Sequence, residues 1–446
     1  MPRTSTIRAD PFFVYGVNQT VHWFIVGLMF PVLILIILGK GLSILEAGTV
    51  LAAYSGTTLL LELPTGGLAD SIGRKRVYLL SLVVMFAAVF VLLLSSGFLL
   101  VLVAIMLYGV ARALSSGTMD AWFVDEFKRK HPAGNLQRAM SKAMVFSPIG
   151  LGVGSLLGGF IPIVLGTSGA ISGSSPYSMN IVVALLAIAV QIALTIFIVV
   201  EVVKPEADSG LAAGLRKVPE VLSSSVAYGI KNRVTFALLV ATLFLGLGLA
   251  SVELLWQPRV QAITGSVGET WVLGVLAAGY FLMASVGSIV STPICRMTGD
   301  NYPRILMGMR VILGGLLFAL ALQGSILAFA LFYLLLYFMI GAAGSPHAAL
   351  YNDQIPSKQR ATMMSFESLI TQGGGLVGSL LIGYVADIWS IPTAWMLAGV
   401  ILATSSLAYL YLALNARRLN LLACPGPEKG RRGDDEIPSS SEKTKI

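Results

Sequence analysis

Cysteine and histidine are scarce in this sequence of 446 residues, and the motifs that use them are missing. The two cysteines, Cys295 and Cys424, lie far apart without CxxC spacing, so neither a disulfide framework nor a zinc site is indicated. The three histidines, at positions 22, 131 and 347, are scattered, and no HExxH motif occurs. The chain also lacks the glycine-rich P-loop through which ATP is hydrolysed. We therefore expect no metal, no cofactor and no enzymatic activity.

Charged residues are scarce as well. They make up 12% of the chain against 56% hydrophobic residues, and the mean hydropathy is +0.83. Soluble domains carry about 25% charged residues, so this chain has too few to cover a surface in water. The net charge is +8, but Lys and Arg lie in short breaks between apolar runs rather than among aromatic residues on one face. This placement favours a lipid bilayer as the partner and argues against nucleic acid.

Long apolar runs are what the sequence has in abundance. A membrane-spanning helix needs about 20 predominantly apolar residues. Runs without Asp, Glu, Lys or Arg cover residues 11–39, 77–111, 143–200, 234–252, 270–295, 311–352, 368–386 and 388–416, and a further run at 48–68 contains only Glu62. Three of these runs are too long for one span and contain polar breaks at 95–97, 166–178 and 323–325. Splitting them predicts an all-α polytopic membrane protein with twelve transmembrane helices.

Basic residues orient these spans. With the N-terminus in the cytoplasm, only Lys40 and Arg259 fall in external loops, while Arg112 and Arg310 fall in or beside apolar segments. All other Lys and Arg residues become cytoplasmic, as the positive-inside rule requires. The sequence therefore predicts a multi-pass protein of the cell membrane (inner or plasma membrane) with both termini in the cytoplasm, and we expect a monomer.

The spans divide into two groups of six. We expect an N-terminal six-helix bundle at 1–201, a cytoplasmic linker at 202–232, a C-terminal six-helix bundle at 233–416 and a cytoplasmic tail at 417–446. Part of the linker, residues 211–232, mixes basic and apolar residues. It fits either a helix lying on the membrane surface or a plain connection between the bundles.

The two groups of six repeat each other at an offset of 222–230 residues. Residues 153–161 match 377–385, residues 137–140 match 359–363, and the pair Asp70 and Arg74 matches Asp300 and Arg304. The matches occur in the same order, which indicates two pseudo-symmetric halves. Repeated six-helix halves place a substrate site near the midplane between them in one class of transporters.

One cytoplasmic loop carries the most specific motif, Gly66-Gly67-Leu68-Ala69-Asp70-Ser71-Ile72-Gly73-Arg74-Lys75-Arg76. It resembles the motif of the loop between helices two and three of the major facilitator superfamily. The resemblance implies the major facilitator fold and a gating role for Gly66, Asp70, Gly73, Arg74 and Lys75. It also implies that Asp70 locks against the start of helix eleven, near 360–362, and that the loop arginine is linked by charge to Asp125.

The predicted fifth helix contains regularly spaced glycines, at Gly150, Gly154, Gly158 and Gly159. It resembles the antiporter motif of proton-driven exporters in the same family, with Ser155 where that motif has proline. The alternative is that the glycines only let two helices approach closely, which small residues do in any membrane protein.

Charged and polar residues at membrane depth are costly, and they are usually functional. Glu62 and Arg112 lie at comparable depth in one half, so we expect an ion pair facing the central cavity, either exchanging a proton or purely structural. Asp120 either faces the cavity or joins the charged residues around Asp125 at the cytoplasmic end. Gln372 is a further candidate for the cavity, whereas Glu253 and Gln257 are expected at the external end of helix seven beside Trp256, an interface anchor.

The function that the resemblance implies is secondary active transport by alternating access. The glycines of the predicted fifth helix and the small number of charged groups expected in the cavity favour proton-coupled export of lipophilic or amphiphilic small molecules, such as drugs or antibiotics. The alternative is proton-coupled import of a small metabolite such as a sugar or an organic ion.

Overall fold

The computed structural model describes residues 10–166, 175–201, 228–229, 231–297, 299, 301–356, 359–416 and 418–419. The predicted linker and tail lie almost wholly outside these residues, as do the two interpretations of the segment 211–232. Within the described residues, the secondary structure consists of helices, as the apolar runs predict.

The helices of the first half are α1 Pro11–Met29, α2 Leu33–Gly39, α3 Ile44–Ile72, α4 Arg74–Leu94, α5 Phe98–Ser115, α6 Thr118–Lys130, α7 Leu136–Ala143, α8 Phe146–Val164 and α9 Ser178–Ile198. Those of the second half are α11 Arg233–Thr264, the 3-10 turn η1 Val267–Glu269, α12 Trp271–Met297, α13 Tyr302–Ala321, α14 Ile326–Asp353, α15 Arg360–Ile388, α16 Ile391–Thr404 and α17 Ser406–Leu414. The described residues contain eleven segments long and apolar enough to cross a membrane, three of which join consecutive helices: α5 with α6, α7 with α8, and α16 with α17. The bent pair of α1 and α2, taken as one span, brings the number to twelve. The expected all-α membrane fold is confirmed, with eleven to twelve spans where twelve are predicted.

Several spans are broken where the sequence interrupts a regular helix. The first span bends by 44° between α1 and α2, where Pro31 has no N–H for the backbone ladder. The break between α5 and α6 is at Gly117, whose φ of +67° favours glycine. Arg112, in the last turn of α5, and Asp120, in the first turn of α6, lie on either side of this break.

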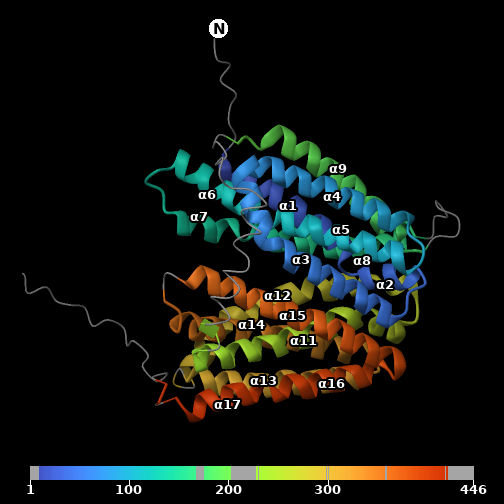
Figure 1. The fold of residues 1–446 in the computed structure, drawn as a ribbon. Helices are drawn as coiled ribbons and strands as arrows, with labels where there is room; N and C mark the ends of the chain where they lie inside the picture. Colours follow the sequence, from blue (N-terminus) through green and yellow to red (C-terminus); the bar gives the residue numbers. More distant parts are fainter. Residues whose placement is uncertain are drawn as a thin grey trace, which may run out of the picture.

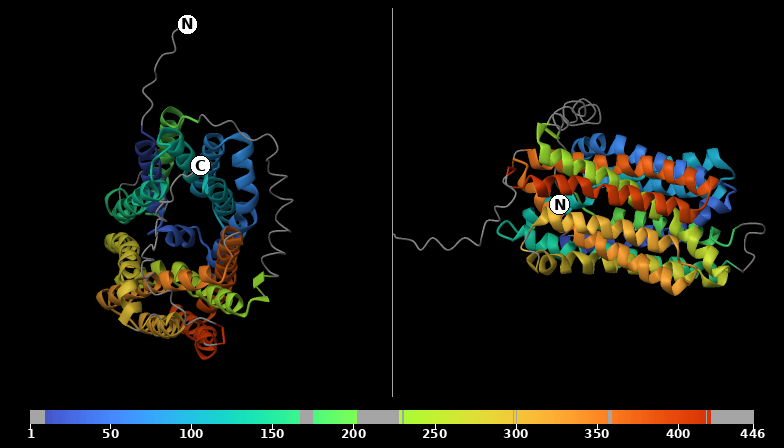
Figure 2. Two further views of the ribbon diagram at one scale, coloured as in Figure 1. Left: turned by 90° about the vertical axis from the view of Figure 1, so that its left-hand side faces the viewer. Right: turned by 90° about the horizontal axis from the view of Figure 1, so that it is seen from below.

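The helices form two bundles that lie side by side with their axes roughly parallel (Figure 1). Helices α1–α9 form one bundle and α11–α17 the other, and Figure 2 shows the two bundles end-on in its left view. Contacts of α3 with α15 and of α8 with α12 join them. We call the end with Gly73 and the α6–α7 connection the motif end, and the end with Gly41 and Ser266 the opposite end.

Large apolar side chains cover the outside of both bundles. Leu99, Phe197, Ile289 and Leu327 are between 69% and 82% exposed. Such a surface suits lipid rather than water, because apolar side chains at this density would associate in solution. The surface therefore agrees with a multi-pass membrane protein.

Within each bundle, glycines bring helices into backbone contact. On α8, a Cβ atom at Gly150, Gly154 or Gly158 would collide with a carbonyl oxygen of α1, that of Thr20, Phe24 and Leu28 in turn. On α15, Gly374 and Gly378 meet α11 in the same way, at the Leu243 and Leu247 carbonyls. The repeated Gly-Ser-Leu-Leu segments of the two halves thus lie in equivalent helix pairs. Gly159 instead meets Gly274 of α12, across the two bundles.

We predict that Gly154→Val destabilises the protein. The valine side chain would push α8 away from α1, and overpacking of this kind costs about 1–3 kcal/mol. The melting temperature of the purified protein in detergent measures this loss. Gly152→Val is the matched control on the same helix, because a Cβ at Gly152 meets nothing within 4 Å. Equal melting temperatures for the two variants would contradict the prediction.

Candidate functional site

A cavity of about 570 Å³ lies between the two bundles. Helices α1, α3, α4 and α5 form its wall on one side, and α11 and α15 form the wall on the other. The lining is dominated by apolar and aromatic side chains, among them Trp23, Phe30, Tyr108 and Leu249. The expected cavity at the interface of the halves is therefore present, and its chemistry is mainly that of an apolar binding site.

Arg112 supplies the positive charge of this cavity. It lies in the last turn of α5, where a helix C-terminus favours a cation. Its guanidinium carbon is 5.8 Å from the centre of the Trp23 ring, a cation–π distance that partly offsets the removal of water. Tyr54 of α3 also interacts with Arg112 electrostatically. An arginine held by aromatic rings still has N–H groups to offer to a ligand in the cavity.

Glu253 supplies the negative charge, from the other bundle. It lies on α11, lines the cavity and is exposed to it. Arg112 and Glu253 are thus charges of opposite sign on opposite walls. Gln372 of α15 also lines the cavity, where the sequence analysis placed it.

The surroundings of Glu253 differ from the expectation. The helix does not end at Glu253 but continues to Thr264. A single carboxylate and Pro258 do not end a helix that packs against α15 and α16. Trp256 is 1% exposed and is a core residue, not an anchor at the membrane interface. The apolar run 234–252 stops at Glu253 because this residue faces the cavity, not because the helix ends there.

Glu62 and Arg112 do not form the expected ion pair in this conformation. Glu62 instead accepts a hydrogen bond from the Ser116 hydroxyl at 2.9 Å, one turn closer to the motif end than Arg112. Glu62 is described by the structure but does not line the cavity. The two residues are at similar depth, yet the Arg112 side chain turns towards α1 and the Glu62 side chain towards the α5–α6 break.

Asp120 joins neither the cavity nor the ion pair at the motif end. It accepts a hydrogen bond from the Tyr15 hydroxyl at 2.5 Å and lies in the first turn of α6, where the helix N-terminus favours a carboxylate. This contact fastens α6 to α1 within the first bundle.

A network of charges holds the motif end of the first bundle together. Arg74 forms an ion pair with Asp125, the partner expected from the sequence, and donates to the Ala121 carbonyl. Glu201 follows α9 and accepts from the backbone N–H groups of Arg74 at 2.6 Å and Lys75 at 3.2 Å. The Glu201 carboxylate thereby caps the N-terminus of α4, a favourable place for a negative charge. Sequence reasoning missed Glu201, because 126 residues separate it from Lys75.

Two positions of the loop motif, Asp70 and Gly66, belong to helix α3, but the structure does not describe their side-chain surroundings. The side chains of Asp70 and of residues 360–362 belong to the part of the chain that is not described, so the expected lock between them stays a prediction. Gly66 also lies at a position whose surroundings are not described, although α3 runs through it.

Hydrogen bonds between the two bundles gather at the opposite end. Gln257 of α11 donates to the Phe30 carbonyl and accepts from the Ile34 N–H, both at 2.8 Å, across the bend of the first span. Three more of these bonds join Ile44 to Asp387, Gln261 to Tyr177 and Thr270 to Gly159. Burial raises the pKa of Tyr177, which lies before α9 in the loop, so its hydroxyl stays neutral as it accepts from Gln261. These contacts close the cavity at the opposite end.

Gly73 is needed at the start of α4 for two reasons. Its φ is +101°, and an added Cβ would come within 2.7 Å of a Glu201 carboxylate oxygen. We predict that Gly73→Ala lowers the melting temperature more than Gly97→Ala, which alters the N-cap of α5. Gly97 also has a positive φ, of +74°, but its Cβ would meet nothing within 4 Å. The unfavourable backbone conformation costs alanine about 1–3 kcal/mol in either variant. Displacement of the Glu201 cap adds to this cost only at Gly73.

The extra loss at Gly73 should disappear in a Glu201→Ala background, where no carboxylate remains to be displaced. The four melting temperatures of this double-mutant cycle measure the coupling. An extra loss of the same size with and without Glu201 would contradict the proposed contact.

Comparisons with known proteins agree with this architecture. The family model of the Major Facilitator Superfamily matches residues 13–285 and 260–433. No curated protein matches the chain. Among solved structures, the nucleoside transporter NupG superposes with a TM-score of 0.72 at 12% identity, covering 91% of this chain and 99% of NupG.

Two further structures show the same fold. The peptide transporter POT in complex with sulfate has a TM-score of 0.69 at 13% identity, with 94% of this chain and 97% of POT covered. A POT family transporter in complex with 5-aminolevulinic acid has a TM-score of 0.67 at 12% identity, covering 91% and 96% of the two chains. At such low identity these structures share the fold alone. Since the family model matches the chain across both bundles, this protein belongs to the major facilitator superfamily.

Proposed function

We propose that this secondary transporter exports lipophilic or amphiphilic small molecules, drugs or antibiotics among them, in exchange for protons. The observation that carries the proposal is the cavity between the bundles. Its walls are largely apolar and aromatic, and its lining contains one arginine and one glutamate, Arg112 and Glu253. An amphiphile with a large apolar body and one ionic group matches such a site. A sugar needs many hydrogen-bonding side chains around its ring.

Alternating access gives the inter-bundle contacts their role. With both termini and the motif end in the cytoplasm of the cell, as the basic loops favour, the bonds of Gln257 close the external side. Cargo then enters the cavity from the cytoplasm, and a rocking of the bundles exposes it to the outside. We assign the gating of this movement to Gly66, Asp70, Gly73, Arg74, Lys75 and Asp125.

The ion pair of Arg74 with Asp125 and the cap by Glu201 support that assignment. They join α4, α6 and the end of α9 within one bundle, so the bundle can move as a rigid body. The glycines of α8 add to this rigidity at the contact with α1. A single chain contains both bundles and the whole cavity, which supports transport by a monomer.

The alternative function is proton-coupled import of a small metabolite, such as a sugar or an organic ion. One observation favours it, namely the opposite charges of Arg112 and Glu253, which also suit a small ion with little apolar surface. NupG is a nucleoside transporter and POT a peptide transporter, so the same fold accommodates polar cargo.

Ethidium flux in proteoliposomes tests the proposal. We predict that a pH gradient accelerates ethidium movement by the wild-type protein and that a protonophore abolishes the acceleration. Glu253→Gln should lower the flux about tenfold, because the cation loses a charged partner in the cavity. Glu269→Gln is the matched control, since Glu269 is exposed at the opposite end outside the cavity.

An ethidium flux that is unchanged by the pH gradient would count against proton antiport. Uptake of sugars, nucleosides or peptides in the absence of ethidium flux would favour the importer. Equal ethidium flux by the Glu253→Gln and Glu269→Gln variants would remove Glu253 from cargo recognition.

A further inference from the structure

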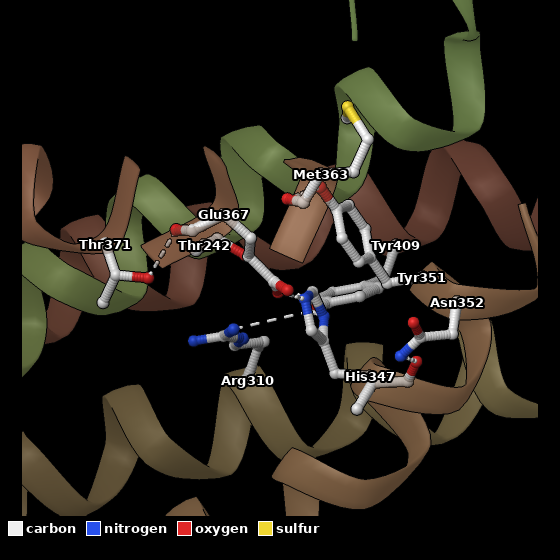
Figure 3. Close-up of polar contacts among 10 residues, drawn as sticks. Thr242, Arg310, His347, Tyr351, Asn352, Met363, Glu367, Thr371 and Tyr409 are labelled. Carbon is white, nitrogen blue, oxygen red and sulfur yellow. Dashed lines mark hydrogen bonds and ion pairs between the residues drawn. The ribbon is translucent and has the colours of Figure 1, made fainter. Parts of the chain in front are cut away.

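A second group of polar side chains lies inside the C-terminal bundle, towards the motif end from the cavity. We call it the C-bundle cluster, and it consists of Thr242 of α11, Arg310 of α13, His347 of α14, Glu367 of α15 and Tyr409 of α17 (Figure 3). Five helices thus converge on one titratable centre. Sequence reasoning gave none of these residues a role, because they are spread over 168 positions of the chain.

A chain of hydrogen bonds runs through the cluster from a cation to a carboxylate. Arg310 donates to the Tyr409 hydroxyl at 3.4 Å, and Tyr409 lies 2.8 Å from His347 Nδ1. On its other side, His347 Nε2 lies 2.8 Å from a Glu367 carboxylate oxygen. Thr242 Oγ1 is 3.2 Å from the same nitrogen. The imidazole therefore lies between a carboxylate and a hydroxyl that is itself bonded to a guanidinium.

The charge of Arg310 is what makes this cluster unusual. The residue is 2% exposed, and its Nε and Nη1 atoms make no hydrogen bond to a described residue. A buried cation at membrane depth is costly unless a negative charge balances it. Within the cluster, the carboxylate of Glu367 provides that charge, but it does so through Tyr409 and His347 rather than by direct contact. The balance of charge thus depends on the protonation of the groups between them.

We infer that His347 and Glu367 together form the proton-binding site of this transporter, and that its occupancy biases the relative position of the two bundles. The inference rests on the proposed proton coupling and gives it a location. It differs from the position expected from the sequence, which is Glu62 with Arg112.

Binding of one proton reverses a hydrogen bond in the cluster. In the neutral imidazole, Nε2–H donates to Glu367 and Nδ1 accepts from the Tyr409 hydroxyl. A proton added at Nδ1 turns this nitrogen into a donor, so the Tyr409 hydroxyl must rotate and accept from both His347 and Arg310. Two cations then face one carboxylate, where one cation faced it before. The added positive charge changes the relative free energies of two arrangements of these helices. Binding of the proton therefore shifts the population towards the arrangement that accommodates the charge better.

Among the described residues, few other titratable groups lie around the imidazole. From α14, the Tyr351 ring stacks on His347 with centroids 6.3 Å apart, but its hydroxyl donates to the Met363 carbonyl at 2.8 Å. Arg310 comes from α13, Glu367 from α15 and Tyr409 from α17, while α11 contributes the uncharged Thr242. The side chains of His347 and Glu367 are 13% and 23% exposed, so the site is not sealed inside the bundle.

Helix α15 connects the cluster with the cavity and with the other bundle. The Thr371 hydroxyl donates to the Glu367 carbonyl at 3.0 Å, and Thr371 and Gln372 line the cavity. Further along α15, the Ser379 carbonyl lies against Gly48 of α3, in the first bundle. A shift of α15 on proton binding would therefore change the cavity wall and the inter-bundle contact at the same time.

Distances between two spin labels, measured by pulsed electron–electron double resonance in the absence of cargo, test the inference. The labels are attached at Ala133→Cys, between α6 and α7, and at Asp353→Cys, at the end of α14, both exposed at the motif end. The background carries Cys295→Ala and Cys424→Ala. We expect the ratio of short to long inter-bundle distances to change about fivefold or more between pH 8.5 and pH 5.5. In Glu367→Gln and His347→Gln this pH response should be lost, while Glu269→Gln should retain it.

The possible results separate the inference from the proposed function. A wild-type response that persists in both cluster variants overturns the inference but leaves proton coupling at another site. No response in the wild type overturns the inference and also counts against proton coupling. A response lost equally in Glu269→Gln overturns the inference as well, because the loss would not be specific to the cluster. Size-exclusion profiles matching the wild type show that the variants are folded.

Discussion

Inside the apolar span, a backbone amide or a charged side chain has no water to bind, and each one left without a partner costs several kcal/mol. Helices satisfy the amides, so the architecture is helical, and close glycine contacts then let whole helices approach without polar side chains. The few charges that remain at this depth must find partners across helices. Each bundle contains an arginine next to an aromatic ring, Arg112 over Trp23 and Arg310 over Tyr409. Most features of the structure follow from how these charges are accommodated.

The two arginines are accommodated in different ways, and the difference suggests a division of labour. Arg112 faces a cavity shared by both bundles, where a ligand can approach it. Arg310 is enclosed by one bundle and is bonded to Tyr409, which leads to His347. In the mechanism we propose, the charge open to cargo serves recognition and the enclosed charge with titratable neighbours serves proton exchange. The helix α15 borders both places, so in this proposal recognition and proton binding act through the same helix.

Much of the fold could be predicted from the sequence, because apolar runs and basic loops report directly on burial in lipid. The ion pair of Arg74 with Asp125 was accessible through the family motif. Glu253 was misplaced, since a single charge at the end of an apolar run resembles the end of a span. The pairing of His347 with Glu367 could not be predicted, because it depends on how α14 and α15 rotate against each other. Composition and spacing contain no information on that rotation.

The two ends of the protein are held by different kinds of force. At the opposite end, the described contacts between the bundles are hydrogen bonds and backbone approaches, such as Gly159 against Gly274. At the motif end, the ion pair of Arg74 with Asp125 stiffens one bundle from within. At 0.1 M, salt largely screens exposed charges that are more than about 10 Å apart, screens closer exposed pairs in part and hardly affects buried hydrogen bonds. Salt would thus weaken the partly exposed pair of Arg74 and Asp125 only in part. At the opposite end it would act on the exposed bond of Ile44 to Asp387 and leave the buried bonds at Ile34 and Gly159 unchanged.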